Sequence, residues 1–173
     1  MQDKPVILIN GSGGVGKDTF IDFCKELVPC FNISTVDKVK EAAGLLGWDG
    51  SKAEKDRRFL SDLKCLSSLY SDHSYQYIKE KIEEFQQNPF WDMMFFHSRE
   101  PEEIQRFKEL GCATLLITNN NVAVIQSNMA DANVLNFIYD HYIDNSDSLE
   151  HLKCEAINFS HKVLAGHKKS QRA

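Results

Sequence analysis

The chain has 173 residues, of which 42% are hydrophobic and 26% are charged, and its net charge at pH 7 is −5. These values suit a single α/β domain over residues 1–173 with a proper core, and the acidic balance argues against a general nucleic-acid-binding surface. No apolar run approaches the roughly 20 residues that a membrane-spanning helix needs, so we expect neither a membrane nor a nucleic acid as a partner.

The cysteines and the start of the chain favour a cytoplasmic protein. The five cysteines are odd in number and form no C-x-x-C pair, which favours reduced thiols in the core and gives no ligand spacing for zinc. They are Cys24, Cys30, Cys65, Cys112 and Cys154. The first five residues lead directly into an apolar run, which leaves no room for a signal peptide.

A glycine-rich loop lies between the first predicted strand, Val6–Asn10, and the first predicted helix. The loop matches G-x-x-x-x-G-K, and apolar residues recur after it at helical spacing, at Phe20, Phe23, Cys24, Leu27 and Val28. Strand, loop and helix in this order form a P-loop, whose backbone N–H groups and helix N-terminus bind phosphate groups. We predict that a nucleoside triphosphate binds here, although the motif alone does not choose between a kinase, an ATPase and a GTPase. In a kinase Lys17 is catalytic, because its charge can follow the transferring phosphoryl group. The predicted contacts are Gly11, Ser12, Gly13, Gly14, Val15, Gly16, Lys17, Asp18 and Thr19.

The residue after Lys17 departs from the usual P-loop pattern. A serine or threonine normally follows the lysine and its hydroxyl holds Mg²⁺, whereas this chain has Asp18 and places a hydroxyl one residue later, at Thr19. We expect Mg²⁺ to accompany ATP, with Asp18 and Thr19 as its site and part of the contact made through water. The alternative is that Asp18 only stabilises the first turn of the helix, as any carboxylate there does.

The order Lys17-Asp18-Thr19 resembles that of kinases of small metabolites. Nucleoside monophosphate kinases often carry a threonine two residues after the lysine, and phage-type deoxynucleoside monophosphate kinases and animal-type phosphomevalonate kinases carry G-K-D. The chain therefore resembles the P-loop nucleoside and nucleotide kinases, adenylate-kinase-like proteins included. This resemblance implies a three-layer P-loop NTPase fold, in which helices flank a parallel sheet of about five strands and a helical insertion binds the phosphoryl acceptor.

Strands and helices alternate along the rest of the chain, which by itself favours a parallel sheet covered on both faces. The further predicted strands are Phe31–Ser34, Met93–His97, Ala113–Thr118 and Tyr139–Ile143. A long helical insertion, over about 37–87, separates the second strand from the third and contains two amphipathic helices. Their apolar positions are Phe59, Leu63, Leu66 and Tyr70 in one and Ile78, Ile82 and Phe85 in the other. A final helix starts with a predicted capping box of Asp147 and Glu150 and buries Leu149, Leu152, Ala156, Phe159 and Val163.

The insertion carries the cations that we expect on the acceptor side of the site. Lys40 follows the second strand closely, at a place where the resembled kinases carry a lysine near the acceptor phosphate. Arg57, Ser61 and Lys64 share one helix face, which is a candidate phosphate cradle. The predicted substrate-binding residues are Asp37, Lys40, Arg57 and Lys64.

Two residues of the insertion have competing interpretations. Arg58 lies four residues from both Glu54 and Asp62, so an ordinary salt-bridged surface explains it, and Arg57 is preferred as the phosphate ligand. Trp48 either stacks on a base or belongs to the core, and the core is the commoner place for a tryptophan.

Arg99 follows the third predicted strand and is predicted to be catalytic. Ligands of open α/β sheets bind outside the carboxyl ends of the strands, where a guanidinium can clamp a phosphate at two points. The alternative is a surface ion pair with Glu102 or Glu103. The resembled kinases carry D-V-R here, whereas this chain has His97-Ser98-Arg99, so His97 replaces a carboxylate that can organise Mg²⁺. We expect His97 to be a hydrogen-bonded structural histidine rather than a proton carrier.

These patterns lead to one expected function and two alternatives. We expect an ATP-dependent phosphotransferase that acts on a small phosphorylated substrate, a nucleoside monophosphate or deoxynucleotide, with ATP and Mg²⁺ as cofactors. Adenylate-kinase-like enzymes carry a lid with arginines, but the corresponding stretch, 119–131, contains no Arg or Lys. This absence and His97 leave a nucleotide-binding protein that no longer catalyses as one alternative. The other is a kinase of a non-nucleotide metabolite, such as phosphomevalonate or dephospho-coenzyme A.

Overall fold

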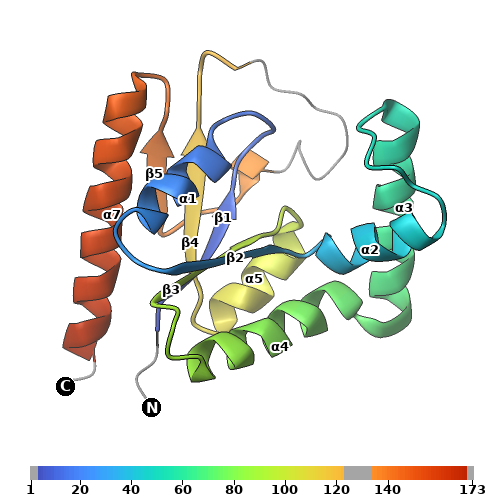
Figure 1. Ribbon diagram of the computed structural model, residues 1–173, viewed down its shortest axis with the longest axis horizontal. Coiled ribbons are helices and arrows are strands. Elements are labelled where there is room, and N and C mark those ends of the chain that lie inside the picture. The colour runs from blue at the N-terminus through green and yellow to red at the C-terminus, as the bar shows by residue number, and fades with distance from the viewer. Residues whose placement is uncertain (1–3, 123–133, 171–173) are drawn as a thin grey trace.

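The computed structural model of the protein describes residues 4–122 and 134–170. Five parallel strands form one sheet in the order β2-β3-β1-β4-β5 (Figure 1). The strands are β1, Val6–Asn10; β2, Cys30–Ser34; β3, Met93–His97; β4, Ala113–Thr118; and β5, His141–Asp144. In the centre of the sheet, Ile9 of β1 lies opposite His97 of β3 and Leu115 of β4. The loop after β1 therefore emerges between the ends of these two neighbours.

The inner strands are continuous apolar runs because helices cover both of their sides. Every residue of β1 is buried, as are the residues from Met93 to Phe96 in β3. Alternate residues of a strand point to opposite faces, so a strand that is covered on both faces needs apolar residues throughout. The edge strands β2 and β5 instead mix buried and exposed residues.

Two layers of helices enclose the sheet (Figure 1). One layer consists of α1, Lys17–Lys25, and α7, Leu149–Ser170. The other consists of α4, His73–Gln87, and α5, Pro101–Glu109. Phe20 of α1 packs edge-to-face on Phe95 of the sheet, and Phe107 of α5 does the same on Phe96 from the opposite side. The predicted three-layer α/β fold is confirmed.

Two further helices, α2, Asp37–Leu45, and α3, Glu54–Ser71, lie beyond the edge strand β2 and far from α7 (Figure 1). No residue of α3, which the structure describes in full, is buried, and Leu66 and Tyr70 on its predicted apolar face are 64% and 92% exposed. In α4, by contrast, Ile78 and Phe85 are buried. The stretch 37–87 thus contains the projecting pair α2 and α3, which we call the helical arm, and α4, which covers the sheet.

The last helix starts one residue later than its predicted cap implies. Ser148 caps α7, because its Oγ accepts a hydrogen bond from the His151 N–H at 3.2 Å and its carbonyl accepts one from Leu152 at 3.1 Å. The predicted capping box of Asp147 and Glu150 is therefore wrong, and Leu149, expected in the core, is 59% exposed. The other predicted core residues of α7 are buried: Leu152, Ala156, Phe159 and Val163. A short 3₁₀ helix, η1, Val134–Asn136, precedes β5.

None of the five cysteines, all of which lie in the described ranges, forms a disulfide. Cys24, Cys30 and Cys112 are buried as predicted, whereas Cys65 and Cys154 are exposed, so the prediction of core thiols is wrong for these two. Among the helices of the described ranges, none combines the length and the apolar character that a membrane crossing requires.

Candidate functional site

The loop after β1 turns at Gly11, where only a glycine fits. Its φ is 145°, and a Cβ there would overlap the carbonyl oxygen of Ile117 in β4. The Asn10 side chain fixes the same turn: its Oδ1 accepts a hydrogen bond from the Gly11 N–H at 2.8 Å, and its Nδ2 donates to the Tyr139 hydroxyl at 2.8 Å. Tyr139 donates in turn to the Val134 carbonyl at 2.9 Å. The start of the loop is thereby anchored to the segment that enters β5.

Asn145, between β5 and α7, holds the other end of the loop. Its Nδ2 donates to the Val15 carbonyl at 2.9 Å, and a Cβ on Gly16, whose φ is 96°, would overlap the same nitrogen. The Asn145 N–H donates to the carbonyl of Thr118, at the end of β4, at 2.7 Å. Neither Asn10 nor Asn145 is among the predicted site residues, because a lone asparagine belongs to no motif. The one signal each offers is its place at or just beyond the end of a predicted strand.

Lys17 is the first residue of α1, and its ammonium group lies against the loop. Nζ donates to the Gly11 carbonyl at 2.7 Å and to the Ser12 carbonyl at 2.8 Å. The first helical hydrogen bond runs from the Phe20 N–H to the Gly16 carbonyl at 2.9 Å. The positive end of α1 therefore adjoins the ammonium group. A glycine-rich loop, a helix N-terminus and a lysine combined in this way form a phosphate-binding site.

His97, at the end of β3, is held by a neighbouring strand and lies close to the start of α1. Its Nε2 lies 3.1 Å from Asn32 Oδ1 of β2 and 4.0 Å from Asp18 Oδ1. Burial is the main reason why the pKa of His97 is lowered to about 4, and the charge of Asp18 only partly offsets it. His97 is therefore neutral at pH 7 and hydrogen-bonded, in keeping with the structural role expected for it.

Three cations from different parts of the chain lie close enough to His97 for their charges to act on it. The charges of Lys17 in α1, Arg99 after β3 and Lys40 in α2 each lower the pKa of His97, because a nearby positive charge disfavours the imidazolium form. The three charges therefore lie in the neighbourhood of His97, which ends β3 beside β1. Converging cations at this edge of a parallel sheet suit a ligand with several phosphate groups. The roles predicted for Lys17, Arg99 and Lys40 require this proximity.

Asp18 and Thr19 offer two oxygen ligands for Mg²⁺ at the start of α1. Both residues are exposed, and the Asp18 side chain is 89% exposed. Across residues 4–122 and 134–170, no group of three or more His, Cys, Asp or Glu side chains is placed to hold a metal ion. Mg²⁺ prefers oxygen ligands, keeps several waters and binds through substrate phosphates together with one or two carboxylates. This pair therefore fits a metal ion that arrives with a nucleotide.

Two of the predicted acceptor residues make local contacts. Asp37 Oδ2 accepts a hydrogen bond from the Ser34 N–H at 2.7 Å, which fixes the turn between β2 and α2. Arg57 is exposed, and its Nε donates to the Lys52 carbonyl at 3.0 Å, in the loop before α3. Lys40 is also exposed, and of the four residues predicted to bind the acceptor it is the one whose charge lowers the pKa of His97.

Lys64, the fourth predicted acceptor residue, contacts α5. Its Nζ lies 3.2 Å from Glu103 Oε2 and 3.7 Å from Glu100 Oε1, and its side chain is only 13% exposed. In this structure its charge is therefore matched by two carboxylates of the protein, and its substrate-binding role stays a prediction.

Arg58 and Trp48, for which the sequence leaves two interpretations each, also contact nearby residues. Arg58 Nε lies 3.8 Å from Asp62 Oδ2, which is one of the two surface ion pairs that its spacing indicates. Trp48 is half-buried, and its Nε1 donates to the Ser51 carbonyl at 3.0 Å. The indole thus fixes the loop between α2 and α3.

A small cavity borders the loop at the carboxyl ends of the strands. Its volume is about 100 Å³, and its walls include Ser12 and Val15 of the loop, Thr118 at the end of β4, Asn120 just after it, and Leu135 of η1. Its place between the loop, the segment after β4 and the segment before β5 suits part of a nucleotide.

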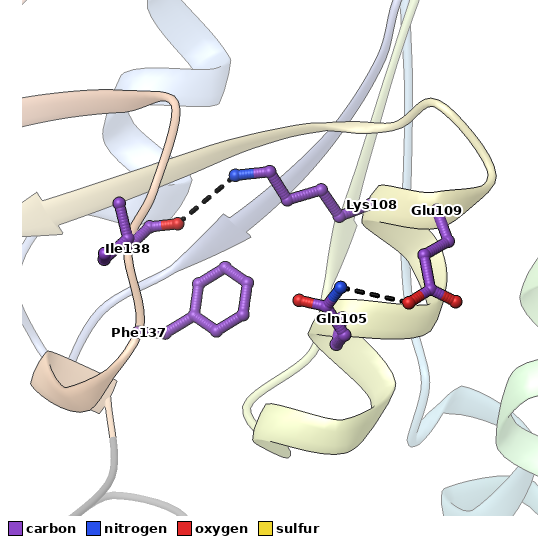
Figure 2. A pocket seen from close by; sticks show the side chains of 5 residues that line it. All are labelled: Gln105, Lys108, Glu109, Phe137 and Ile138. Carbon is purple, nitrogen blue, oxygen red and sulfur yellow. Dashed lines mark hydrogen bonds between the residues drawn. The ribbon is translucent and has the colours of Figure 1, made fainter.

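A larger hollow, of about 390 Å³, lies between α5 and the segment that enters β5 (Figure 2). Figure 2 shows Lys108 extending across it toward the Ile138 carbonyl, with the Phe137 ring facing the same space. Lys108 Nζ also pairs with Asp140 Oδ1 at 2.8 Å, and Asp140 accepts a hydrogen bond from the Thr114 N–H near the start of β4. The hollow therefore lies toward the amino ends of the strands, away from the edge where such sheets bind ligands.

The predicted lid region, 119–131, is described as far as residue 122, and its remainder lies outside the described residues. The Asn120 N–H donates to Ser146 Oγ at 2.8 Å, and Asn121 Nδ2 donates to the Ser146 carbonyl at 2.8 Å. These bonds join the segment after β4 to the loop before α7, which also carries Asn145.

Comparison with known proteins identifies a structural neighbour. No protein-family model matches the chain, and no curated protein sequence matches it. The crystal structure of shikimate kinase from Aquifex aeolicus vf5 is similar, with a TM-score of 0.54 and 12% sequence identity, over 91% of this chain and 96% of that one. At this identity the likeness shows the fold alone, and it agrees with the P-loop kinase fold predicted from the sequence.

Proposed function

We propose that the protein is a P-loop kinase that transfers the γ-phosphoryl group of ATP to a small phosphorylated acceptor. The observation that carries this proposal is that the charges of Lys17, Arg99 and Lys40 all act on His97, at the strand end beside the glycine-rich loop that holds Lys17. Phosphoryl transfer needs positive charge on both phosphate groups and alignment of donor and acceptor, and it needs little covalent help from the protein. The kinase fold of the structural neighbour supports the same reaction class.

In this proposal the cations bind phosphate groups, and two oxygen-bearing side chains bind the metal ion. Lys17 binds the phosphates of ATP, Arg99 stabilises the charge of the transferring group, and Lys40 binds the acceptor phosphate. Asp18 and Thr19 would hold Mg²⁺, which when bound with ATP neutralises phosphate charge.

Nucleoside monophosphates and deoxynucleotides are the acceptors to test first, on the basis of the G-K-D and arginine motifs. The structural neighbour is named for shikimate, which is not a nucleotide, and this keeps a non-nucleotide acceptor in the panel. Phosphomevalonate and dephospho-coenzyme A represent that class together with shikimate.

A second candidate function is nucleotide binding without catalysis, and His97 is the observation that favours it. The resembled kinases have an aspartate at this position, whereas the neutral imidazole of His97 supplies no carboxylate for Mg²⁺. The two candidates differ in one measurable respect, which is the acceptor-dependent release of ADP.

The test is ADP release from ATP and Mg²⁺ against the acceptor panel, with Lys17→Met and Arg99→Ala beside the wild type. We expect turnover with one acceptor and a loss of at least about 100-fold in both variants, because each removes a charge that stabilises the transferring group. Lys25→Met, at the exposed end of the same helix, and the exposed Arg58→Ala serve as charge-matched controls that keep turnover. Circular dichroism shows whether the variants retain the fold.

The outcomes separate the two candidates. Undiminished turnover in Lys17→Met would exclude the proposed mechanism. If no acceptor gives turnover, but calorimetry detects ATP binding that is weaker in Lys17→Met, the protein belongs to the non-catalytic class.

A further inference from the structure

One nearly buried carboxylate, Glu103 in α5, contacts both the helical arm and the turn that carries Arg99. Its Oε2 accepts a hydrogen bond from Ser98 Oγ at 2.5 Å and one from Lys64 Nζ at 3.2 Å. The side chains of Glu103 and Lys64 are 12% and 13% exposed, and Ser98 is 2% exposed. Both contacts are therefore largely shielded from water, unlike an ordinary surface ion pair.

The two partners of Glu103 come from different parts of the proposed site. Ser98 directly precedes Arg99, so its hydrogen bond to Glu103 restrains the backbone that carries the guanidinium group. Lys64 lies in the middle of α3, a helix that buries none of its residues and so depends on a few contacts for its position. Glu103 therefore contacts both α3 and the turn at Arg99.

A second contact of α5 lies at the C-terminal end of α3. Arg106 donates two hydrogen bonds to Asp72, at 2.8 and 2.6 Å, and its guanidinium lies 3.6 Å from the centre of the Tyr75 ring. Asp72 lies between α3 and α4, so α5 contacts α3 at Lys64 and the junction of α3 and α4 at Asp72, eight residues further along the chain. The contact at Asp72 fixes the end of the arm, whereas the contact at Lys64 faces the Arg99 turn.

We propose that Glu103 is a positioning residue that couples the helical arm to Arg99. This inference rests on the proposed function, in which the arm carries Lys40 on the acceptor side and Arg99 stabilises the transferring group. When Glu103 is intact, it holds the arm that carries Lys40 at a fixed position relative to the guanidinium group of Arg99. Stability alone does not call for a charged pair here, since well-packed apolar residues usually stabilise a buried site as well as an ion pair does.

The first test compares Glu103→Gln with Glu102→Gln in steady-state kinetics. Glutamine keeps the size of Glu103 and an oxygen that accepts from Ser98, but it removes the charge that attracts Lys64. Glu102 lies exposed in the same first turn of α5, so Glu102→Gln makes the same change near the helix N-terminus without touching the contact. We expect Glu103→Gln to raise the KM for the acceptor about 10-fold and to lower kcat, while the KM for ATP stays within about twofold. Glu102→Gln should match the wild type.

The reciprocal change tests the same contact from the arm. Lys64→Met keeps the length of the side chain and removes its charge, and Lys55→Met, at an exposed position of the same helix, is the control. The double variant Lys64→Met with Glu103→Gln should lose less than the product of the two single losses, because each single change leaves a shielded charge without its partner.

A spectroscopic readout tests the coupling without any turnover. Cys65 adjoins Lys64 and is exposed, and Cys154 is the other exposed cysteine, so a nitroxide on Cys65 in a Cys154→Ser background reports on α3. We expect the label to become more mobile in Glu103→Gln and in Lys64→Met but not in Glu102→Gln. Circular dichroism verifies that each variant is folded.

The outcomes distinguish this inference from the proposed function. If Glu103→Gln equals Glu102→Gln in label mobility, the contact does not hold α3 and the inference is wrong. If mobility rises but the acceptor KM and kcat do not change, the contact is structural only, and the inference is also wrong. If the wild type phosphorylates no acceptor, the proposed function fails, and label mobility alone then decides whether Glu103 fixes the arm.

Discussion

At the scale of single residues, His97 shows how its surroundings set the charge of the site. Its imidazole is 20% exposed, and the charges of three cations act on it against that of Asp18, so protonation would add a positive charge in a poorly solvated place. An aspartate there, as the resembled kinases have, would instead be stabilised as a carboxylate by the same cations. A histidine in place of that aspartate therefore makes the site more positively charged.

The stability of the protein should depend on pH through His97. The folded-state pKa is about 4, against an ordinary value of 6.5, so the unfolded chain binds the extra proton between these values. The effect of His97 is therefore to lower the free energy of unfolding as the pH drops from above 6.5 toward 4. By linkage, His97 accounts for about 2 kcal/mol of the loss between pH 7 and pH 5.

Urea denaturation at pH 7 and pH 5, in magnesium-free buffer, checks this expectation. His97→Asn and His97→Gln cannot titrate, so both variants should lose about 2 kcal/mol less than the wild type between the two pH values. If the wild type and both variants lose equal amounts, His97 does not have the depressed pKa that its burial implies.

Gly11 should tolerate no side chain, for a reason that is independent of nucleotide binding. A Cβ at this position would overlap the Ile117 carbonyl, which belongs to β4 and cannot move aside, and the φ of 145° is strained for other residues. We expect Gly11→Ala to lower the free energy of unfolding by at least about 2 kcal/mol. Thermal or urea denaturation without nucleotide measures this loss.

Gly13 provides the matched control in the same loop. A Cβ there would meet no atom within 4 Å, and its φ lies outside the left-handed region. Gly13→Ala should therefore leave the free energy of unfolding within about 0.5 kcal/mol of the wild type. Equal losses in the two variants would show that the loop as a whole, rather than the approach of Gly11 to β4, sets the cost.

The residues of the site were predictable only where a motif or a strand end marks them. The loop from Gly11 to Lys17 follows from its spacing, and Arg99 follows from its place after an apolar strand. The partner of Lys64 does not, because Glu103 lies 39 residues away and only the tertiary fold brings the two together. Asn145 was missed for the same reason, since its contact with Val15 spans 130 residues.

At the scale of secondary-structure elements, the inner strands were predicted better than the edge strands. The bounds of β1, β3 and β4 match their predictions because burial on both faces leaves a continuous apolar run. At the edges, β2 starts at Cys30 rather than Phe31, and β5 runs over His141–Asp144 rather than Tyr139–Ile143. Tyr139 is apolar enough to suggest a strand, but its hydroxyl is used to hold Asn10.

The helices show the limit of apolar periodicity as a signal. α3 has the spacing of an amphipathic helix, yet Leu66 and Tyr70 face solvent because the sheet ends at β2 and offers no surface beyond it. α4 has a similar pattern, but it lies over the sheet and buries Ile78 and Phe85. Periodicity predicts that a helix forms, whereas only the arrangement of layers decides what its apolar face contacts.

At the scale of the whole molecule, this arrangement predicts an uneven distribution of stability. The strands β1 and β3 are buried between two helical layers, so their amides can exchange only when the domain unfolds. The described ion pairs that join this part of the chain to α5 lie at Lys64 of α3 and at Asp72, which directly follows α3, and no residue of α3 is fully buried. Opening of α3 therefore exposes no fully buried side chain of that helix and should cost much less than global unfolding.

Hydrogen exchange at increasing urea concentrations measures this difference. We expect the amides of α3 to exchange at least about 10-fold faster than those of β1, with little dependence on urea, because local opening exposes little surface. α4 is the matched control: it is a neighbouring helix of 15 residues with buried apolar side chains, and its protection should follow that of the sheet. If α3 instead shows the protection and urea dependence of β1, the arm unfolds together with the core. A separate placement of the arm, fixed through Glu103, would then have no physical basis.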